Sequence, residues 1–175
     1  FCRRVLEASG YFQPGPTWKL DPFASQKRKI LLASESAILA LGGVLDRALA
    51  AERQNRQTQR ETLYELLLGS AWGNQGDLSI WSVEEARPDH DQIDAQEAHL
   101  LINQAAELAD FILDGKPLAR VDLILDNCGP ELIGDLGLVD YLLSAGLAQS
   151  VRLHAKAHPT YVSDVLIKDI QPTIE

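Results

Sequence analysis

Residues 121 to 139 of the chain read VDLILDNCGPELIGDLGLV, and this stretch decides the fold. A mostly apolar run ends at the polar pair Asp126-Asn127, and a Cys-Gly-Pro turn follows. Glu131 then begins a segment with apolar residues at helical spacing, namely Leu132, Ile133, Leu136 and Val139. The pattern predicts a strand, a polar strand end and an amphipathic helix. Ligands of open α/β sheets bind beyond the carboxyl ends of strands, so Asp126 and Asn127 are the first candidates for a functional site.

A second strand is predicted at residues 151–156, after a helix over residues 130–143 that stops at Gly146. A strand, a helix and a strand of these lengths form a crossover, which joins parallel strands. The carboxyl ends of both strands then lie on one edge of the sheet. The sequence therefore predicts an α/β fold with a parallel β-α-β core, in which residues after Lys156 come close to Asp126-Asn127.

The upstream part of the chain shows helical spacing and few strand signals. We expect residues 1–92 to form a helical N-terminal region and residues 93–175 a partial α/β domain, together one domain overall. The acidic residues 82–93, broken by a proline, are expected to link the two parts. Asp94 is expected to cap a helix that reaches Leu113.

Glycines divide the predicted N-terminal helices. One helix is expected over residues 24–41, with Gly42-Gly43 interrupting it before the pattern resumes. Another is expected over residues 61–68, with Gly69 as its stop. The polar stretch 52–60 between them contains three arginines and is interpreted as a solvated helix face.

The bulk composition excludes several classes of protein. The chain has 175 residues, of which 46% are hydrophobic, and a formal charge of −9, which disfavours nucleic acid and anionic membranes as partners. No window approaches the length of a membrane span, and the first residues lack a signal-peptide core. Cys2 and Cys128 do not form a disulfide framework. We expect a cytoplasmic protein; the sequence does not decide its oligomeric state.

The candidate chemistry lies at the sheet edge. Asp126, Asn127 and Asp164 supply hard oxygen donors of the kind that Mg²⁺ or Mn²⁺ binds together with water and a phosphate oxygen. The alternative is a polar strand-to-turn junction with no ligand. Glu131 is either a helix N-terminal carboxylate or a group facing a metal. Lys156 is either an exposed strand-end lysine or a phosphate partner.

Three motifs follow one another along the chain. They are Trp72-Gly73-Asn74-x-x-Asp77-Leu78-Ser79, Asp126-Asn127-x-Gly129-x-Glu131-Leu132 with Asp135 beyond, and Lys156-x-x-Pro159-x-x-Val162-Ser163-Asp164. They resemble the three signatures of the metal-dependent damage-control phosphatases, the family that includes the acidic-residue methyltransferase-like sugar-phosphate phosphatases. The spacing of 38 residues from Asp126 to Asp164 fits that subgroup. Asp21-Pro22-Phe23 followed by Lys27 also resembles the N-terminal helical region of the family.

The resemblance implies a fold and a site. The implied fold is a three-layer α/β/α sandwich with a helical N-terminal cap. The implied metal is Mn²⁺, Co²⁺, Ni²⁺ or Mg²⁺, and the implied activity is the hydrolysis of small phosphomonoesters, sugar phosphates among them. The resemblance assigns metal binding to Asp126, Asn127 and Asp164. It assigns catalysis to Asp126, Asp164 and Glu131, and substrate binding to Asn74, Asp77, Asn127 and Lys156.

The chain departs from the family pattern in two places. Cys128 and Pro130 flank Gly129 where a smaller and a bulkier apolar residue, respectively, are expected. The Arg-Thr-x-Lys phosphate-binding signature, which lies further toward the C-terminus in the family, is absent. We therefore expect the chain to be a fragment that lacks part of its own site.

Other functions and mechanisms stay open at this point. An S-adenosylmethionine-dependent carboxyl methyltransferase is one alternative, although no x-Gly-x-Gly loop follows a strand. A non-catalytic module that binds metal or sugar phosphate is another. In a phosphatase, Asp126 is interpreted as a metal ligand, and the alternative is a nucleophile that forms an aspartyl-phosphate.

Overall fold

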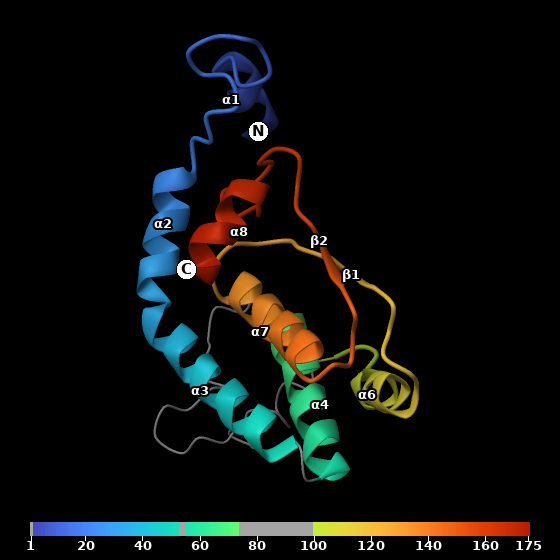
Figure 1. Ribbon diagram of the computed structural model, residues 1–175. Helices are drawn as coiled ribbons and strands as arrows, with labels where there is room; N and C mark the ends of the chain where they lie inside the picture. The colour runs from blue at the N-terminus through green and yellow to red at the C-terminus, as the bar shows by residue number, and fades with distance from the viewer. Residues whose placement is uncertain (1, 53–54, 74–99) are drawn as a thin grey trace.

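The computed structural model describes residues 2–52, 55–73 and 100–175 (Figure 1). Four helices come first in the chain: α1 (Cys2–Ala8), α2 (Ala24–Ala33), α3 (Glu35–Glu52) and α4 (Arg56–Trp72). The remaining elements are α6 (Ala105–Asp114), β1 (Val121–Ile124), α7 (Pro130–Ser144), β2 (Val151–His154) and α8 (Ile167–Ile174). Helices are therefore the main component of the described chain, and the two strands lie in its C-terminal half.

The predicted β-α-β unit is confirmed. β1 and β2 pair in parallel, with Val121 opposite Val151 and Ile124 opposite His154. α7 begins at Pro130, whose missing N–H is not needed in a first helical turn. It ends just before Gly146, which has a φ of +69° and whose N–H donates to the carbonyl of Leu143 at 3.1 Å. Both strands end two residues earlier than predicted, although the Leu125 N–H still donates to the His154 carbonyl at 3.0 Å.

The two faces of the sheet have different surroundings. Val121, Leu123, Val151 and Leu153 contact the hydrophobic clusters, whereas the alternating residues Asp122, Ile124, Arg152 and His154 are exposed. Alternation of this kind follows from the two-residue period of a strand. Within the described residues, helices cover one face of the sheet. The mixed α/β character is thus confirmed, and the third layer of an α/β/α sandwich stays a prediction.

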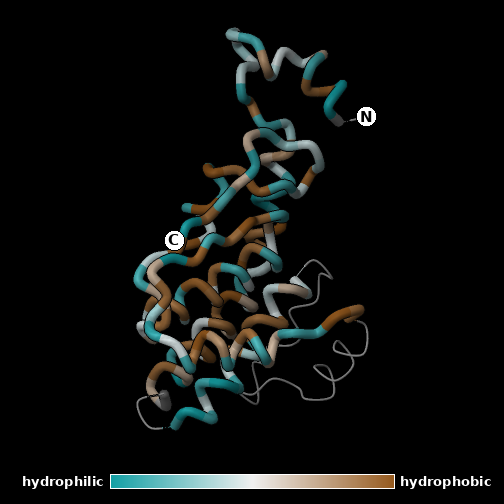
Figure 2. The backbone as a smooth tube through the Cα atoms, turned by 90° about the vertical axis from the view of Figure 1, so that its right-hand side faces the viewer, coloured by the Kyte–Doolittle hydropathy of each residue, from teal (hydrophilic) through white to brown (hydrophobic). Residues whose placement is uncertain are grey.

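The main hydrophobic core lies between the helices. Its buried members come from α3, α4, α6 and α7, together with Ala148 before β2, and Figure 2 shows hydrophobic segments stacked through this part of the molecule. Gly134 lets α7 approach α4 closely, because a Cβ at Gly134 would lie 3.1 Å from the carbonyl oxygen of Gly69. Gly69 therefore lies on the side of α4 that packs against α7. The core joins the N-terminal helices to the β-α-β unit.

Several predicted helix boundaries are wrong. The helix expected over residues 24–41 divides at Ser34, whose hydroxyl donates to the carbonyl of Ile30 at 2.9 Å. α3 continues through Gly42-Gly43, and α4 continues past Gly69 to Trp72. Burial of apolar neighbours on the same helices outweighs the roughly 1 kcal/mol that a helical glycine costs.

The remaining boundary concerns α6. The prediction that residues 100–104 belong to this helix is wrong, because α6 begins at Ala105. Its predicted end before Gly115 is confirmed. The Asn103 carboxamide oxygen accepts from the Ala105 N–H at 3.1 Å, which starts the helix there. Asp94, the linker 82–93 and the boundary between residues 92 and 93 lie outside the described residues. The division into two parts stays a prediction.

The polar stretch between α3 and α4 contains a helix start. Asn55 caps α4, since its side chain accepts from the Gln57 N–H at 2.9 Å. Arg60 is not only a solvated residue, because its guanidinium binds the Asp110 carboxylate of α6 at 2.6 Å. None of the helices in the described residues is long and apolar enough to cross a membrane.

Candidate functional site

The two predicted ligand segments lie side by side beyond the strand ends. The Val165 N–H donates to the Asp126 carbonyl at 2.9 Å, and the Cys128 N–H donates to the Ser163 carbonyl at 2.7 Å. Between these hydrogen bonds, Asn127 and Asp164 form an isolated antiparallel bridge. The loop after β1 and the segment before α8 are thus fixed to each other by their backbones. This confirms that Asp126-Asn127 and Asp164 converge at one sheet edge.

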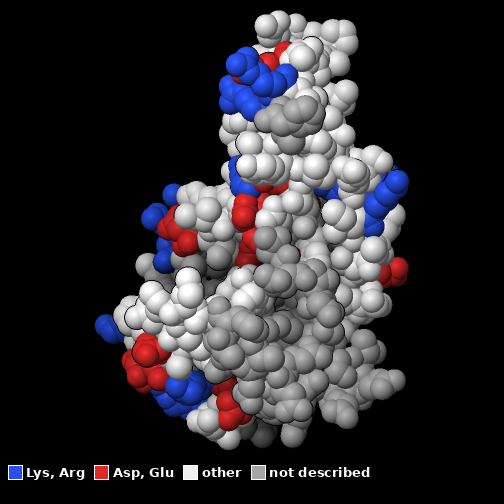
Figure 3. Space-filling model, turned by 180° about the vertical axis from the view of Figure 1, so that it is seen from behind, with Lys and Arg blue, Asp and Glu red and all other residues white. Residues whose placement is uncertain are grey.

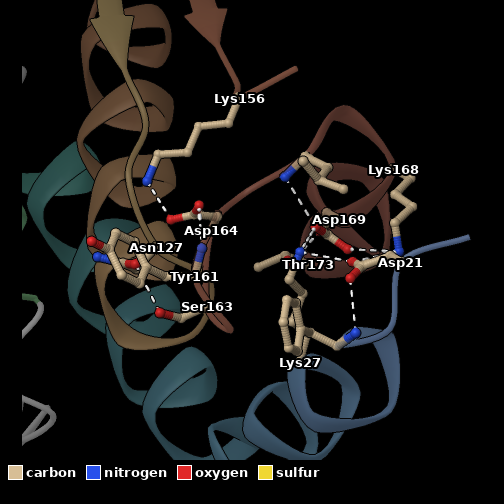
Figure 4. A network of polar contacts seen from close by, with 12 residues as sticks. Asp21, Lys27, Asn127, Lys156, Tyr161, Ser163, Asp164, Lys168, Asp169 and Thr173 are labelled. Carbon is tan, nitrogen blue, oxygen red and sulfur yellow. Dashed lines mark hydrogen bonds and ion pairs between the residues drawn. The ribbon is translucent and has the colours of Figure 1, made fainter. Parts of the chain in front are cut away.

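Lys156 lies between the two carboxylates. Its ammonium group contacts Oδ1 of Asp126. It also lies 2.5 Å from Oδ1 of Asp164 (Figure 4). The Asp164 side chain is 2% exposed and the Asp126 side chain 59% exposed, so one carboxylate is buried and the other faces solvent. A single cation is therefore shared by a buried and an open carboxylate.

Backbone groups complete the environment of Asp164. Its Oδ2 accepts from the N–H groups of Thr160 at 2.6 Å and Tyr161 at 2.8 Å. Burial opposes ionisation, but the hydrogen bonds from Lys156 and from these two backbone groups hold the pKa of Asp164 below its ordinary value. Burial also opposes the charge of Lys156, yet hydrogen bonds to Asp126 and Asp164 raise its pKa. Both groups are charged at neutral pH.

The Asn127 carboxamide is fixed at both ends. Its Nδ2 donates to Glu131 Oε2 at 3.0 Å. Its Oδ1 accepts from the Ser163 hydroxyl at 2.8 Å (Figure 4). The Asn127 N–H also points to Glu131, at 3.4 Å from Oε1. Glu131, in the first turn of α7, therefore acts here as an orienting acceptor for Asn127. With one lone pair engaged by Ser163, Oδ1 keeps a second one for another partner.

The donor set fits a hard divalent cation. Two carboxylates and one carboxamide oxygen are the ligand types that Mg²⁺ and Mn²⁺ prefer. The ammonium of Lys156 marks a position where Asp126 and Asp164 already share one cation. Among the described residues, no group of three His, Cys, Asp or Glu side chains is placed to hold a metal, and the carboxamide of Asn127 is a further oxygen donor next to Asp126 and Asp164.

Two predicted substrate-binding residues cannot be placed. Asn74 and Asp77 lie outside the described residues. The residue before them is described: a Cβ at Gly73 would lie 2.4 Å from Cα of Glu131, so the end of α4 packs directly on the backbone of the site. Lys156 and Asn127, the other two predicted substrate-binding residues, are part of the site as described above.

Cys128 is buried beneath the site and free. Burial, reinforced by the nearby Asp169 carboxylate, raises the pKa of the Cys128 thiol to about 12. A thiol of this kind stays protonated at neutral pH and is a poor nucleophile. Cys128 therefore packs with Leu125, Leu132 and Val165 as a small apolar residue.

Sequence reasoning did not single out Ser163 as a site residue, although it stands in the third motif. Only the structure shows that its hydroxyl orients Asn127. The backbone N–H groups of Thr160 and Tyr161 were also missed, because no side-chain pattern reports on them. A nearby network of Asp21, Lys27, Lys168 and Asp169 was missed as well, and Asp21 and Lys27 were its only visible signal.

Charge is mixed on the described part of the surface seen in Figure 3. There, Lys and Arg side chains and Asp and Glu side chains gather in separate small groups. The expectation that the protein does not bind nucleic acid stays a prediction.

Comparison with known proteins agrees with the motifs. The family model of the damage-control phosphatase ARMT1-like domain matches residues 1–175. The chain belongs to this family. The damage-control phosphatase ARMT1 of Danio rerio is 34% identical over 184 residues, covering 99% of this chain and 41% of the relative. The proteins of the same name from Rattus norvegicus and Homo sapiens are 33% and 31% identical, again over 99% of this chain and 41% of each relative.

Membership of the ARMT1-like family makes this chain part of a damage-control phosphatase family, a hydrolase family. The chain spans about two-fifths of the length of the curated relatives it matches. The described part of this ARMT1-like domain contains the second and third motifs, with Asp126, Asn127 and Asp164 converging, together with the Trp72-Gly73 start of the first.

Proposed function

We propose that the protein is a divalent-metal-dependent phosphatase that hydrolyses small phosphomonoesters, sugar phosphates among them. The observation that carries the proposal is the shared cation position: Lys156 contacts both Asp126 and Asp164, and the Asn127 oxygen is oriented by Ser163 beside them. A structural turn needs neither a buried carboxylate nor a cation between two acids. Family membership supports the phosphatase chemistry.

Phosphoryl transfer depends mainly on positioning the group and neutralising its charge. Mn²⁺, Co²⁺, Ni²⁺ or Mg²⁺ held by Asp126, Asn127 and Asp164 would supply Lewis-acid stabilisation and a more acidic bound water. The N–H groups of Thr160 and Tyr161 hold Asp164 Oδ2, which leaves Asp164 Oδ1 to face the cation position. Asp126 acts as a ligand, because its open carboxylate faces the same cation position as the buried Asp164.

Two side chains of the site have further roles. Glu131 holds the Asn127 carboxamide so that its oxygen is available on the Ser163 side. Lys156 is 31% exposed, and its ammonium would give up its place between the two carboxylates to the divalent cation and neutralise the charge of a phosphate bound beside it. We assign Asn74 and Asp77 to substrate binding as well, on the strength of the first motif alone.

The first prediction tests the site in the full-length protein. Hydrolysis of p-nitrophenyl phosphate and of a panel of sugar phosphates should require added Mn²⁺, Co²⁺, Ni²⁺ or Mg²⁺ and stop in chelator. Asp126→Ala should lower kcat/KM at least about 100-fold, since it removes a charged ligand from the site. The matched control is Asp122→Ala, because Asp122 is an exposed carboxylate of β1, four residues before Asp126, that binds Arg120 and His154 outside the site.

Full activity in chelator, or in the Asp126→Ala variant, would contradict the proposal. Metal binding without turnover of any phosphomonoester would favour the non-catalytic module instead. Calorimetric titration with S-adenosylmethionine separates the methyltransferase alternative, because a phosphatase should give no saturable heat. The proposal is supported if phosphatase activity requires added metal, if Asp126→Ala loses that activity and if Asp122→Ala keeps the kcat/KM of the wild type.

A further inference from the structure

A second polar network lies beside the candidate metal site and joins the N-terminal helices to the last helix. The Lys27 ammonium of α2 lies 2.9 Å from Asp21 Oδ2 and 2.7 Å from Asp169 Oδ2 of α8 (Figure 4). Lys168 also approaches Asp21 Oδ2, at 3.0 Å, from the surface. The network thus connects Lys27 and Asp169, which are 142 positions apart in sequence.

Lys27 is an unusual component of this network because its side chain is only 4% exposed. Burial opposes its charge, but hydrogen bonds to Asp169 and Asp21 raise its pKa above the ordinary value, so the ammonium is charged. A buried ion pair costs desolvation of both partners and often adds little net stability over an apolar packing. Its geometric effect, the fixing of one element against another, is therefore the more informative property.

Asp169 transmits this contact to the segment that carries Asp164. Its Oδ2 accepts from Lys27 and also from the Leu166 N–H at 3.0 Å, which caps α8. Leu166 follows Asp164 by two residues, and it forms a parallel bridge with Lys156. A continuous series of contacts therefore runs from the Lys27 ammonium through Asp169 to Leu166, two residues after Asp164.

The same helix contacts the other ligand segment. Ile30 lies about one turn after Lys27 on α2, and a Cβ at Gly129 would lie 2.4 Å from Ile30 Cγ2. Gly129 has a φ of +87° and follows Asn127 by two residues. α2 therefore contacts both ligand segments. Its Ile30 packs on Gly129 in the loop after Asp126-Asn127, and its Lys27 binds Asp169, in the helix that follows Asp164.

We infer that α2 sets the distance between the two ligand segments, and that Lys27 is a positioning residue that acts on Asp164 through Asp169. This inference rests on the proposed function, in which Asp126, Asn127 and Asp164 hold the divalent cation. Lys27 itself contacts neither metal nor substrate. Loss of its ammonium frees the Asp169 carboxylate and loosens the segment from Asp164 to Leu166.

The test measures metal binding in the full-length protein with Lys27→Met. Titration calorimetry with Mn²⁺ should show a dissociation constant raised about tenfold or more, in the range seen when groups that orient metal ligands are removed. The visible absorption spectrum of bound Co²⁺ should also change, because it reports on the arrangement of the ligands. Asp169→Asn keeps an oxygen for the Leu166 N–H but loses the charge that binds Lys27, and it should also raise the Mn²⁺ dissociation constant. This second variant tests the inference if Lys27→Met does not fold.

Two controls separate positioning from general stability. Lys168→Met removes a cation from the exposed side of the same network and should change the Mn²⁺ dissociation constant less than about twofold, because Lys168 lies 3.6 Å from Asp169 Oδ1, whereas Lys27 and the Leu166 N–H both bind Oδ2. Leu63→Ala lowers stability from the helical core and should leave the Co²⁺ spectrum unchanged. An unaltered Mn²⁺ affinity and Co²⁺ spectrum in a folded Lys27 or Asp169 variant would overturn the inference. Failure of the wild-type protein to bind Mn²⁺ would overturn the metal site, and with it the inference.

Discussion

At the residue scale, Asp135 shows how the fold changes the chemistry of a single group. Its carboxyl lies in α7 and is 5% exposed, and it accepts from the Ser70 hydroxyl of α4 at 2.5 Å. Burial raises the pKa of Asp135 to about 6, while the Ser70 hydrogen bond opposes the rise and the nearby Glu131 adds to it. The folded protein therefore holds a proton at Asp135 that the unfolded chain releases near pH 4.

The stability of the protein should consequently depend on this one group. The folded state binds the Asp135 proton more tightly than the unfolded chain does, so this proton stabilises the folded protein. The stabilisation is complete below about pH 4, falls as the pH rises and is lost above about pH 6. Asp135→Asn should remove this slope and raise the unfolding free energy at pH 7 by up to roughly 3 kcal/mol. Urea unfolding of the wild type and of Asp135→Asn at pH 4, 5, 6 and 7 measures the pH dependence of the free energy of unfolding. Asp140→Asn, an exposed change on the same helix, is the control, and an unchanged slope in Asp135→Asn would contradict the assignment.

At the element scale, the end of α4 is joined to the first turn of α7 by close backbone packing. Gly73 has an ordinary helical φ of −52°, so its backbone conformation does not require glycine. The requirement is space, because a Cβ would lie 2.4 Å from Cα and 2.9 Å from the backbone nitrogen of Glu131. Since Glu131 orients Asn127, the packing of these two helices also fixes the site.

Gly73→Ala should therefore disturb both stability and metal binding. Shifting backbone to accommodate the methyl group is expected to cost about 1–3 kcal/mol of unfolding free energy and to weaken Mn²⁺ binding in the same variant. Gly42→Ala is the matched control, because nothing lies within 4 Å of where its Cβ would stand on α3 and alanine is the better helix former by about 1 kcal/mol. The midpoint temperature of thermal unfolding should fall in Gly73→Ala and rise in Gly42→Ala. A stabilised Gly73→Ala protein would contradict the close contact.

At the scale of the whole molecule, one hydrophobic core unites the N-terminal helices with the β-α-β unit. Leu63 of α4 is fully buried in this core, together with residues of α3, α6 and α7. The candidate metal site lies instead beside a smaller cluster, formed by Leu125, Cys128, Leu132 and Val165. The molecule thus separates the main source of its stability from the residues proposed to bind metal.

Leu63→Ala should test this separation. Removing the side chain leaves a cavity in the core and should lower the free energy of unfolding by about 2–5 kcal/mol. Mn²⁺ affinity below the unfolding transition should stay within about twofold of wild type. Circular dichroism during urea unfolding and calorimetry on the folded variant measure the two quantities. A marked loss of metal affinity without unfolding would show that core and site are coupled.

The sequence by itself determined the local features. Hydrophobic periodicity predicted the β-α-β unit, and Gly146 and Gly115 ended their helices as expected, because a helix end depends on the few residues next to it. The parallel crossover then required Asp126-Asn127 and Asp164 to meet at one sheet edge. Motif spacing identified the family before any contact was known, and the assignment of these three residues to metal binding stays a prediction.

Only the tertiary structure decided which distant groups meet. Gly69 and Gly42-Gly43 looked like helix stops, but packing of α4 and α3 on α7 keeps both helices continuous. The placement of Lys156 between two carboxylates and the pairing of Lys27 with Asp169 leave no periodic trace in the sequence. The physical reason is that such contacts depend on where whole elements come to rest, and that position is set by the summed burial of many side chains.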